Sequence, residues 1–123
     1  MDQKTTLQTL KDRAGAFCIE RDWDQYNNPK DLAIGITTEA CELLDIFRFK
    51  TQEQVVEMFG TPQKREEIED ELADVLFFVL RFAQMNGIDL SEILKKKVEK
   101  NRQKYPVDKV RGKNLKYSEY KEE

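Results

Sequence analysis

The chain contains no histidine, and this absence excludes several common kinds of active site. Zinc sites built on imidazole, Ser-His-Asp triads and the usual general base at neutral pH all require that residue. The two cysteines, Cys18 and Cys41, do not have the spacing of a metal site. Both lie in helical patterns and are interpreted as small buried apolar residues, although a disulfide between them stays open. Chemistry in this chain must therefore use carboxylates, lysine, arginine, hydroxyls or a bound metal.

Long apolar runs are also missing from the chain. No stretch is long and apolar enough to span a membrane. The first residues, Met1-Asp2-Gln3-Lys4, are not followed by the apolar segment of a signal peptide. We therefore expect a cytoplasmic protein that has no membrane partner.

The charge of the chain is unevenly distributed. Residues 1–94 carry 10 basic and 19 acidic residues, whereas residues 95–123 carry 11 basic and 5 acidic residues. The acidic body argues against binding to a nucleic-acid polymer, and an acidic site beside a basic segment suits a metal-bound polyphosphate better. We expect a chain of 123 residues to form one domain, and self-association is one way for it to bury more apolar surface.

The sparse glycines and prolines divide the chain into helical segments, and no convincing strand pattern is present. Apolar periodicity and capping signals predict helices over residues 5–21, 29–49, 52–59, 62–86 and 89–105. The four long ones predict an all-α fold of the four-helix-bundle type. We expect one helical domain over residues 1–106 and a polar tail over residues 107–123, either extended or ordered only by a partner.

Two pairs of carboxylates stand out because each pair is spaced to share one face of a helix. Glu39 and Glu42 lie three residues apart in the second predicted helix, and Glu71 and Asp74 lie three apart in the long helix. Asp74 is the only charged residue in the run Leu72–Leu80, and a helix that apolar is expected to be buried nearly all round.

Four converging carboxylates would repel one another, and burial makes each charge more costly. A divalent cation resolves both problems, and an all-oxygen ligand set favours Mg²⁺ or Mn²⁺ over Zn²⁺. The usual di-iron bundle is excluded because it needs Glu-x-x-His pairs. Acidic pairs also occur on solvated helix faces, which is our interpretation of Glu66, Glu67, Glu69 and Asp70. Spacing alone leaves both interpretations of the candidate pairs open.

The motif Glu39-x-x-Glu42, 28 intervening residues and Glu71-x-x-Asp74 resembles the signature of the MazG-like, all-α nucleoside triphosphate pyrophosphohydrolases. The likeness is strongest to the dCTP pyrophosphatase branch and covers about residues 7–120. Three further segments carry it: Glu20-Arg21-Asp22-Trp23-Asp24-Gln25-Tyr26, Asn101-Arg102-x-Lys104-Tyr105-Pro106 and Lys116-Tyr117. The resemblance implies Mg²⁺-dependent hydrolysis of a nucleoside triphosphate to monophosphate and pyrophosphate, with Mg²⁺ (or Mn²⁺) at the four carboxylates. It also implies a homodimer or homotetramer.

The resemblance also implies a set of substrate-binding residues. Trp23 matches an aromatic residue that packs on the base, and Phe49 and Phe78 are further substrate-binding candidates. Phe49 stands where the branch usually has Trp, and Phe78 where it often has Tyr. Lys97 and Asn101 match phosphate contacts, and Arg102 and Lys104 are further candidates. The family's histidine in the first helix is missing, since Ala14 stands near that place. These departures leave the preferred base open, with dCTP or a related dNTP expected.

Other interpretations of these residues remain. Trp23, Phe49 and Phe78 fit plain core positions, and Lys97 fits a solvated basic face. The chain could bind nucleotide or metal as a helical regulator without turnover. It could also be a structural bundle whose acidic faces form salt bridges to partner chains.

Overall fold

The computed structural model describes residues 1–120, and all the regular secondary structure in that range is helical. The elements are α1 Leu7–Glu20, α2 Pro29–Phe47, α3 Gln52–Gly60, α4 Pro62–Met85, α5 Leu90–Lys104, α6 Val107–Val110 and the 3-10 helix η1 Tyr117–Tyr120. The predicted all-α class is therefore confirmed, and no strand occurs in the described part. None of the helices described combines the length and the apolar character needed to cross a membrane.

The helices begin where short polar side chains cap them. The side chains of Thr6, Asn28 and Thr51 each accept a hydrogen bond from the backbone N–H three residues later. Thr51 also forms a reciprocal capping box with Gln54. Thr61 does not cap α4, because its hydroxyl donates to the Glu57 carbonyl at 3.2 Å. Pro62 at the first position thus marks the start of α4.

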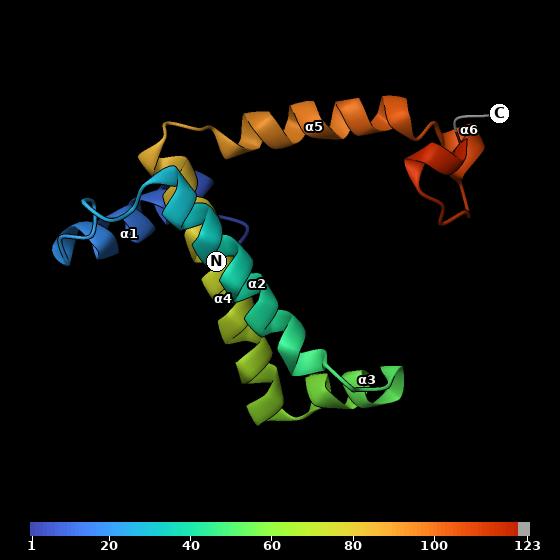
Figure 1. The fold of residues 1–123 in the computed structure, drawn as a ribbon, viewed down its shortest axis with the longest axis horizontal. Coiled ribbons are helices and arrows are strands. Elements are labelled where there is room, and N and C mark those ends of the chain that lie inside the picture. The colour runs from blue at the N-terminus through green and yellow to red at the C-terminus, as the bar shows by residue number, and fades with distance from the viewer. Residues whose placement is uncertain (121–123) are drawn as a thin grey trace. The chain divides into compact units, whose positions relative to one another are not determined.

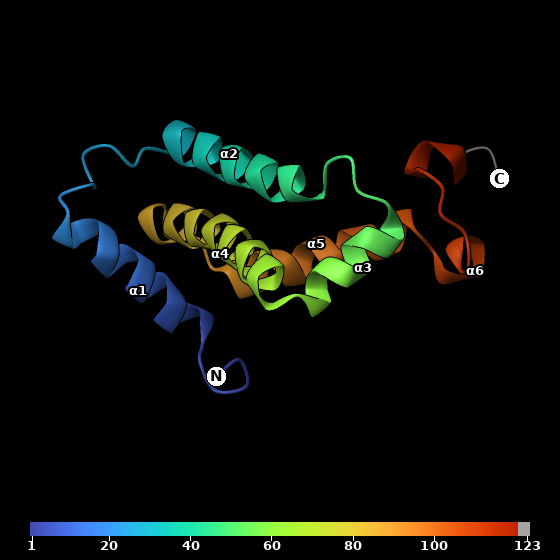
Figure 2. The same ribbon diagram turned by 90° about the horizontal axis from the view of Figure 1, so that it is seen from below.

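The residues Met1–Ile88 form one compact unit built around α4. The chain runs along α2, turns through the short α3 and returns along α4, so α2 and α4 lie side by side and antiparallel (Figure 1). Figure 2 shows α4 between α2 and α1, in agreement with the contacts that α4 makes to both. The buried apolar residues are Ala14, Cys18, Leu32, Met58, Ile68, Leu80 and Ala83. This unit packs three of the four long helices predicted.

The residues Asp89–Glu123 form a second compact unit, which contains α5, the fourth long helix. Asp89 caps α5 by accepting from the Glu92 backbone N–H at 2.9 Å. The predicted polar tail is not wholly extended, because α6 and η1 lie within it. Tyr105 and Tyr117 pack edge to face at 6.0 Å between ring centroids, so the tail folds back on the end of α5. Residues 121–123 of the predicted tail lie outside the described residues.

The expectation that α4 is buried nearly all round is wrong for the single chain. Leu72 is 56% exposed and Leu76 is 45% exposed, whereas Ile68 and Leu80 on the same helix are buried. The reason is geometric, since α1 and α2 cover only two sides of α4. A sequence pattern marks a side chain as apolar but does not say which surface covers it.

The two cysteines also differ from the prediction. Cys18 is buried, and the loss of water around it raises the pKa of its thiol. Cys41 is exposed, so its interpretation as a buried apolar residue is wrong. Both thiols are free, and the disulfide left open by the sequence is not formed.

The close approach of α2 to α4 depends on Gly35. The Phe78 ring packs against this glycine so tightly that an added Cβ would lie 2.5 Å from the ring atoms Cδ1 and Cε1. A ring between two helices has little freedom to move, because protein interiors are densely packed. Gly35 lies one helical turn before Glu39, so this packing also sets the helix spacing at the carboxylates.

We predict that Gly35→Ala lowers the free energy of unfolding by about 1–3 kcal/mol, the usual cost of overpacking. Gly60→Ala is the matched control because nothing lies within 4 Å of its added Cβ. That control should be neutral or stabilising by about 0.4–1 kcal/mol. Urea unfolding of both variants measures the difference. Equal stability of the two variants would contradict the tight packing.

Candidate active site

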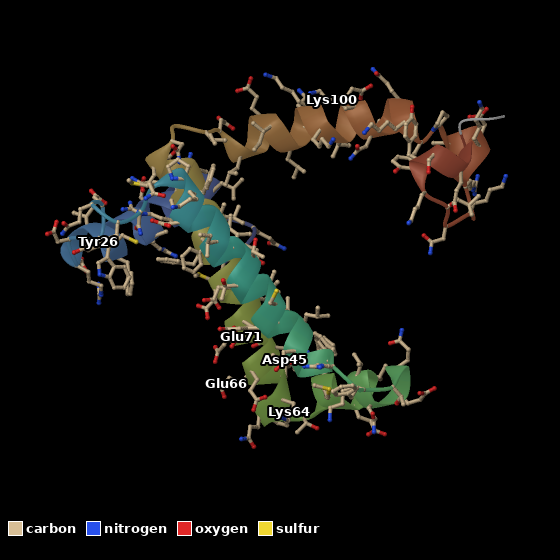
Figure 3. All side chains as sticks on the ribbon, viewed as in Figure 1. Tyr26, Asp45, Lys64, Glu66, Glu71 and Lys100 are labelled. Carbon is tan, nitrogen blue, oxygen red and sulfur yellow. The ribbon has the colours of Figure 1, made fainter. Side chains whose placement is uncertain are left out.

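Carboxylates from α2 and α4 meet midway along the packed pair of helices. One carboxylate oxygen from each of Glu39, Glu42 and Glu71 lies within 4.8 Å of the other two. Figure 3 shows Glu71 beside α2 on the middle of α4, with Glu66 nearer the start of that helix. Glu39 and Glu71 are half-buried, whereas Glu42 is exposed. Both members of the first predicted pair thus meet Glu71 of the second pair, and we call these three residues the carboxylate cluster.

The carboxylate cluster is electrostatically unfavourable without a positive partner. The pKa of the Glu39 carboxyl is raised to about 7, mainly because burial removes water from it and secondly because Glu42 lies beside it. Loss of water and the nearby Glu42 and Asp74 also raise the pKa of Glu71. The Oε2 atoms of Glu39 and Glu71 are buried and have no hydrogen-bond partner. Two buried oxygens without donors are costly unless a cation or proton satisfies them.

These orphaned oxygens fit a divalent metal ion. Hard cations such as Mg²⁺ bind carboxylate oxygens and retain open positions for water and phosphate. Two half-buried ligands would anchor the ion from both helices, and the exposed Glu42 would lie on its open side. Asp74 is exposed and outside the group of three, yet its charge acts on both Glu39 and Glu71. The residues present therefore suit the predicted metal, with Asp74 at the edge of the site.

A groove of about 500 Å³ runs between α1 and α4 and includes Asp74. Its lining is otherwise mostly apolar, and Phe17 and Phe77 supply its aromatic surfaces. The only other charged side chain in the lining is Arg13. Sequence reasoning missed this groove, because the apolar periodicity over residues 5–21 predicts a helix but not which surface covers it.

Aromatic rings connect the groove to the loop between α1 and α2. Trp23, in that loop, meets Phe17 edge to face at 5.7 Å between centroids. Phe17 meets Phe77 at 5.6 Å, and Phe77 meets Phe78 at the same distance. Trp23 stays 41% exposed, so one part of its ring packs while another part faces solvent. Such a half-packed aromatic suits stacking on a planar ligand better than it suits a core.

Phe78 and Phe49, the other two aromatic residues predicted to bind substrate, differ in burial. Phe78 is half-buried against Gly35, as a core residue would be. Phe49 is 89% exposed on a backbone with φ of 63°, and the Arg48 guanidinium lies 4.7 Å from its ring centroid. A positive φ is uncommon for a bulky residue. It is a form of local strain that clusters at functional sites.

The predicted phosphate contacts all lie on α5, in the second unit. Lys97 is exposed and Asn101 is half-buried. Arg102 pairs with Glu99 at 3.3 Å, and the Lys104 ammonium lies 5.5 Å from the Tyr117 ring centroid. These four residues share one basic helix, and their role in binding phosphate stays a prediction.

Sequence reasoning also missed Arg81, the one charged side chain among the described residues that is fully buried. It contacts Asp24 and Asn27 in the loop between α1 and α2, and Gln84 on its own helix. A signal was present, because Arg81 directly follows the apolar run Leu72–Leu80. A lone basic residue in such a helix must find polar partners if it is buried.

Comparison with known proteins identifies relatives of this chain. Residues 34–120 match the MazG-like family. The dCTP pyrophosphatase 1 of Mus musculus is 32% identical over 114 residues, which cover 93% of this chain and 67% of that protein. The Homo sapiens dCTP pyrophosphatase 1 is 31% identical with the same coverage of both chains. A solved pyrophosphatase from Archaeoglobus fulgidus is 36% identical with a TM-score of 0.74, over 80% of this chain and 91% of that one.

The family match begins within α2, covers α4 and continues through α5. The resemblance suggested by the paired carboxylates is thereby confirmed, as is the likeness to dCTP pyrophosphatases. The chain belongs to the MazG-like family and is a homologue of pyrophosphatases.

Proposed function

We propose that this protein hydrolyses a nucleoside triphosphate, dCTP or a related dNTP, to the monophosphate and pyrophosphate. The observation that carries the proposal is the carboxylate cluster, with two buried oxygens that lack partners. The relatives named dCTP pyrophosphatase 1 support the choice of nucleotide. A role in removing unwanted nucleotides or balancing the deoxynucleotide pool follows from that reaction.

Glu39, Glu42 and Glu71 would hold Mg²⁺, with Asp74 as a fourth ligand. When bound, the ion supplies positive charge for the triphosphate and polarises the attacking water. Mn²⁺ suits the same oxygen ligands. The protein's contribution is to fix the carboxylates from two packed helices, so that little rearrangement is needed when substrate arrives.

In the reaction, a water oxygen attacks the α-phosphorus and the bond to the bridging oxygen of the pyrophosphate group breaks. Glu42 is the exposed member of the carboxylate cluster and is our candidate to accept the proton of that water. Lys97 and Asn101 would contact the phosphates, and Arg102 or Lys104 would offset the remaining negative charge. Catalysis of this kind depends mostly on positioning and electrostatics.

The groove between α1 and α4 is our candidate binding site for the nucleoside. It includes Asp74, so a base held there would be close to the carboxylates that organise the phosphates. Its apolar lining fits a base and sugar, and Trp23 adds an exposed aromatic face beside Phe17. Phe49, exposed on its strained backbone, remains the second proposed contact to the base.

Product analysis with each dNTP and Mg²⁺ tests the reaction. We expect monophosphate and pyrophosphate, with dCTP or a close relative turned over fastest and all activity lost in EDTA. Diphosphate with orthophosphate would contradict the mechanism, because cleavage would then lie at the wrong bond. Tight nucleotide binding without product would favour the non-catalytic regulator.

Matched variants link that activity to the carboxylate cluster. Glu71→Gln should lower kcat by about 100-fold or more, the scale of losing one electrostatic contact at a reacting centre. Asp74→Asn should act in the same direction while the helices stay folded. Glu66→Gln is the control because Glu66 is exposed on the same helix and outside the carboxylate cluster. Full activity in Glu71→Gln would remove the cluster from the mechanism.

The raised pKa values predict how metal affects stability. The Glu39 carboxyl has a pKa of about 7 in the folded protein, and burial also raises the pKa of Glu71. Unfolded, both titrate near their ordinary value of about 4.3. Between these values the folded state binds more protons, so the stability of the metal-free protein falls as pH rises from about 4.3 to 7.

Mg²⁺ should counter this loss, because it binds the ionised carboxylates of the folded state. We therefore expect Mg²⁺ to raise Tm more at pH 7.5 than at pH 5, as measured by thermal unfolding at matched ionic strength. Glu39→Gln should reduce the Mg²⁺ effect, whereas Glu66→Gln should preserve it. An equal Tm shift at both pH values would show that the ion acts elsewhere.

A further inference from the structure

The loop between α1 and α2, residues 21–28, carries Trp23 and forms several backbone hydrogen bonds, including bonds to both the N–H and the carbonyl of Trp23. The Trp23 N–H donates to the Cys18 carbonyl at 3.0 Å, and the Trp23 carbonyl accepts from the Asn27 N–H at 3.0 Å. Asp22, just before Trp23, has a φ of 56°, in the left-handed region that side chains disfavour. A strained turn persists only when its surroundings fix it.

Within the loop the Gln25 side chain donates to the Asp22 carbonyl and carboxylate, and Arg81 adds contacts from α4. Its Nε donates to Asn27 Oδ1 at 3.0 Å, and its guanidinium also pairs with the Asp24 carboxylate. Asp24 follows Trp23 in the chain, and Asn27 donates its backbone N–H to the Trp23 carbonyl. Arg81 therefore binds a residue directly after Trp23 and another that is hydrogen-bonded to it.

The same arginine ties this loop to α1. Its third partner, Gln84, lies against Gly15 of α1, where an added Cβ would be 2.9 Å from the Gln84 amide carbon. Arg81 is 0% exposed, whereas the Asp24 side chain is 52% exposed. A buried guanidinium with three partners in fixed directions is a rigid anchor, because its planar fork allows little variation in geometry.

We infer that Arg81 is a positioning residue that sets nucleotide affinity by fixing the loop that presents Trp23. The inference rests on the proposed function, in which Trp23 contacts the base. Arg81 itself lines neither the groove nor the carboxylate cluster. Its loss should therefore weaken binding of the substrate and leave the chemical step nearly unchanged.

The test uses Trp23 as a reporter, because it is the only tryptophan in the chain. Arg81→Met removes the guanidinium but keeps an apolar side chain of similar length, an exchange that buried ion pairs often tolerate. We expect Trp23 emission to shift to the red and acrylamide quenching to increase. We also expect KM to rise about five- to tenfold, the scale of one ordered aromatic contact, with kcat within about twofold.

Two further variants make the result decisive. Arg65→Met is the matched control, because Arg65 is exposed on the same helix and pairs only with Glu69 in the structure. It should leave Trp23 emission and KM unchanged. Asp24→Asn removes the negative charge on the loop side of the link at a half-exposed position, which weakens the contact, and should shift both readouts in the same direction as Arg81→Met, by less. If Arg81→Met does not fold, Asp24→Asn alone tests the inference.

Unchanged Trp23 emission and quenching in folded Arg81→Met and Asp24→Asn would overturn the inference, as would a loss confined to kcat. The fluorescence is measured without nucleotide, so it reports on the loop whether or not the protein is a hydrolase. Failure of the wild type to hydrolyse any dNTP would instead count against the proposed function. The two failures are therefore distinguishable.

Discussion

Glu39, Glu42 and Glu71 bring like charges together between α2 and α4, and either helix packing or a bound cation must offset their repulsion. Glu39 and Glu71 are half-buried, each has one buried oxygen without a donor, and their pKa values are raised. A fold maximising only its own stability would place apolar side chains there. The packing of Phe78 on Gly35 instead holds the helices close enough for the acids to meet. Strain retained in this way is typical of functional sites.

The helices and the paired acids could be predicted from the sequence because local rules decide them. Asn28 before Pro29 and Asp89 before Glu92 marked helix starts, and the structure confirms both. Glu39 and Glu42 lie in one predicted helix, and their i, i+3 spacing put them on one face of it. The resemblance to the MazG-like family then predicted a metal site that also includes Glu71. The approach of Glu39, Glu42 and Glu71 to one another follows from antiparallel packing of two helices, which periodicity suggests but does not measure.

The sequence could not show which neighbouring surface, if any, covers each apolar side chain. Leu72 and Leu76 have the pattern of buried residues, yet both are exposed in the single chain. Cys41 lies in a helical pattern and is exposed as well. Arg81 was not among the predicted site residues, although it anchors the Trp23 loop through contacts with residues more than 50 positions earlier in the chain. Such contacts depend on tertiary geometry, for which a single sequence offers no period or spacing.

If a cation completes the carboxylate cluster, anomalous X-ray diffraction from crystals grown with Mn²⁺ will locate it there. Mn²⁺ prefers the same oxygen ligands as Mg²⁺ and scatters anomalously. We expect an anomalous peak within bonding distance of Glu39, Glu42 and Glu71, and we expect it to disappear in Glu71→Gln. Crystals in which those carboxylates carry no peak, while Mn²⁺ binds elsewhere or not at all, would contradict the proposed metal site.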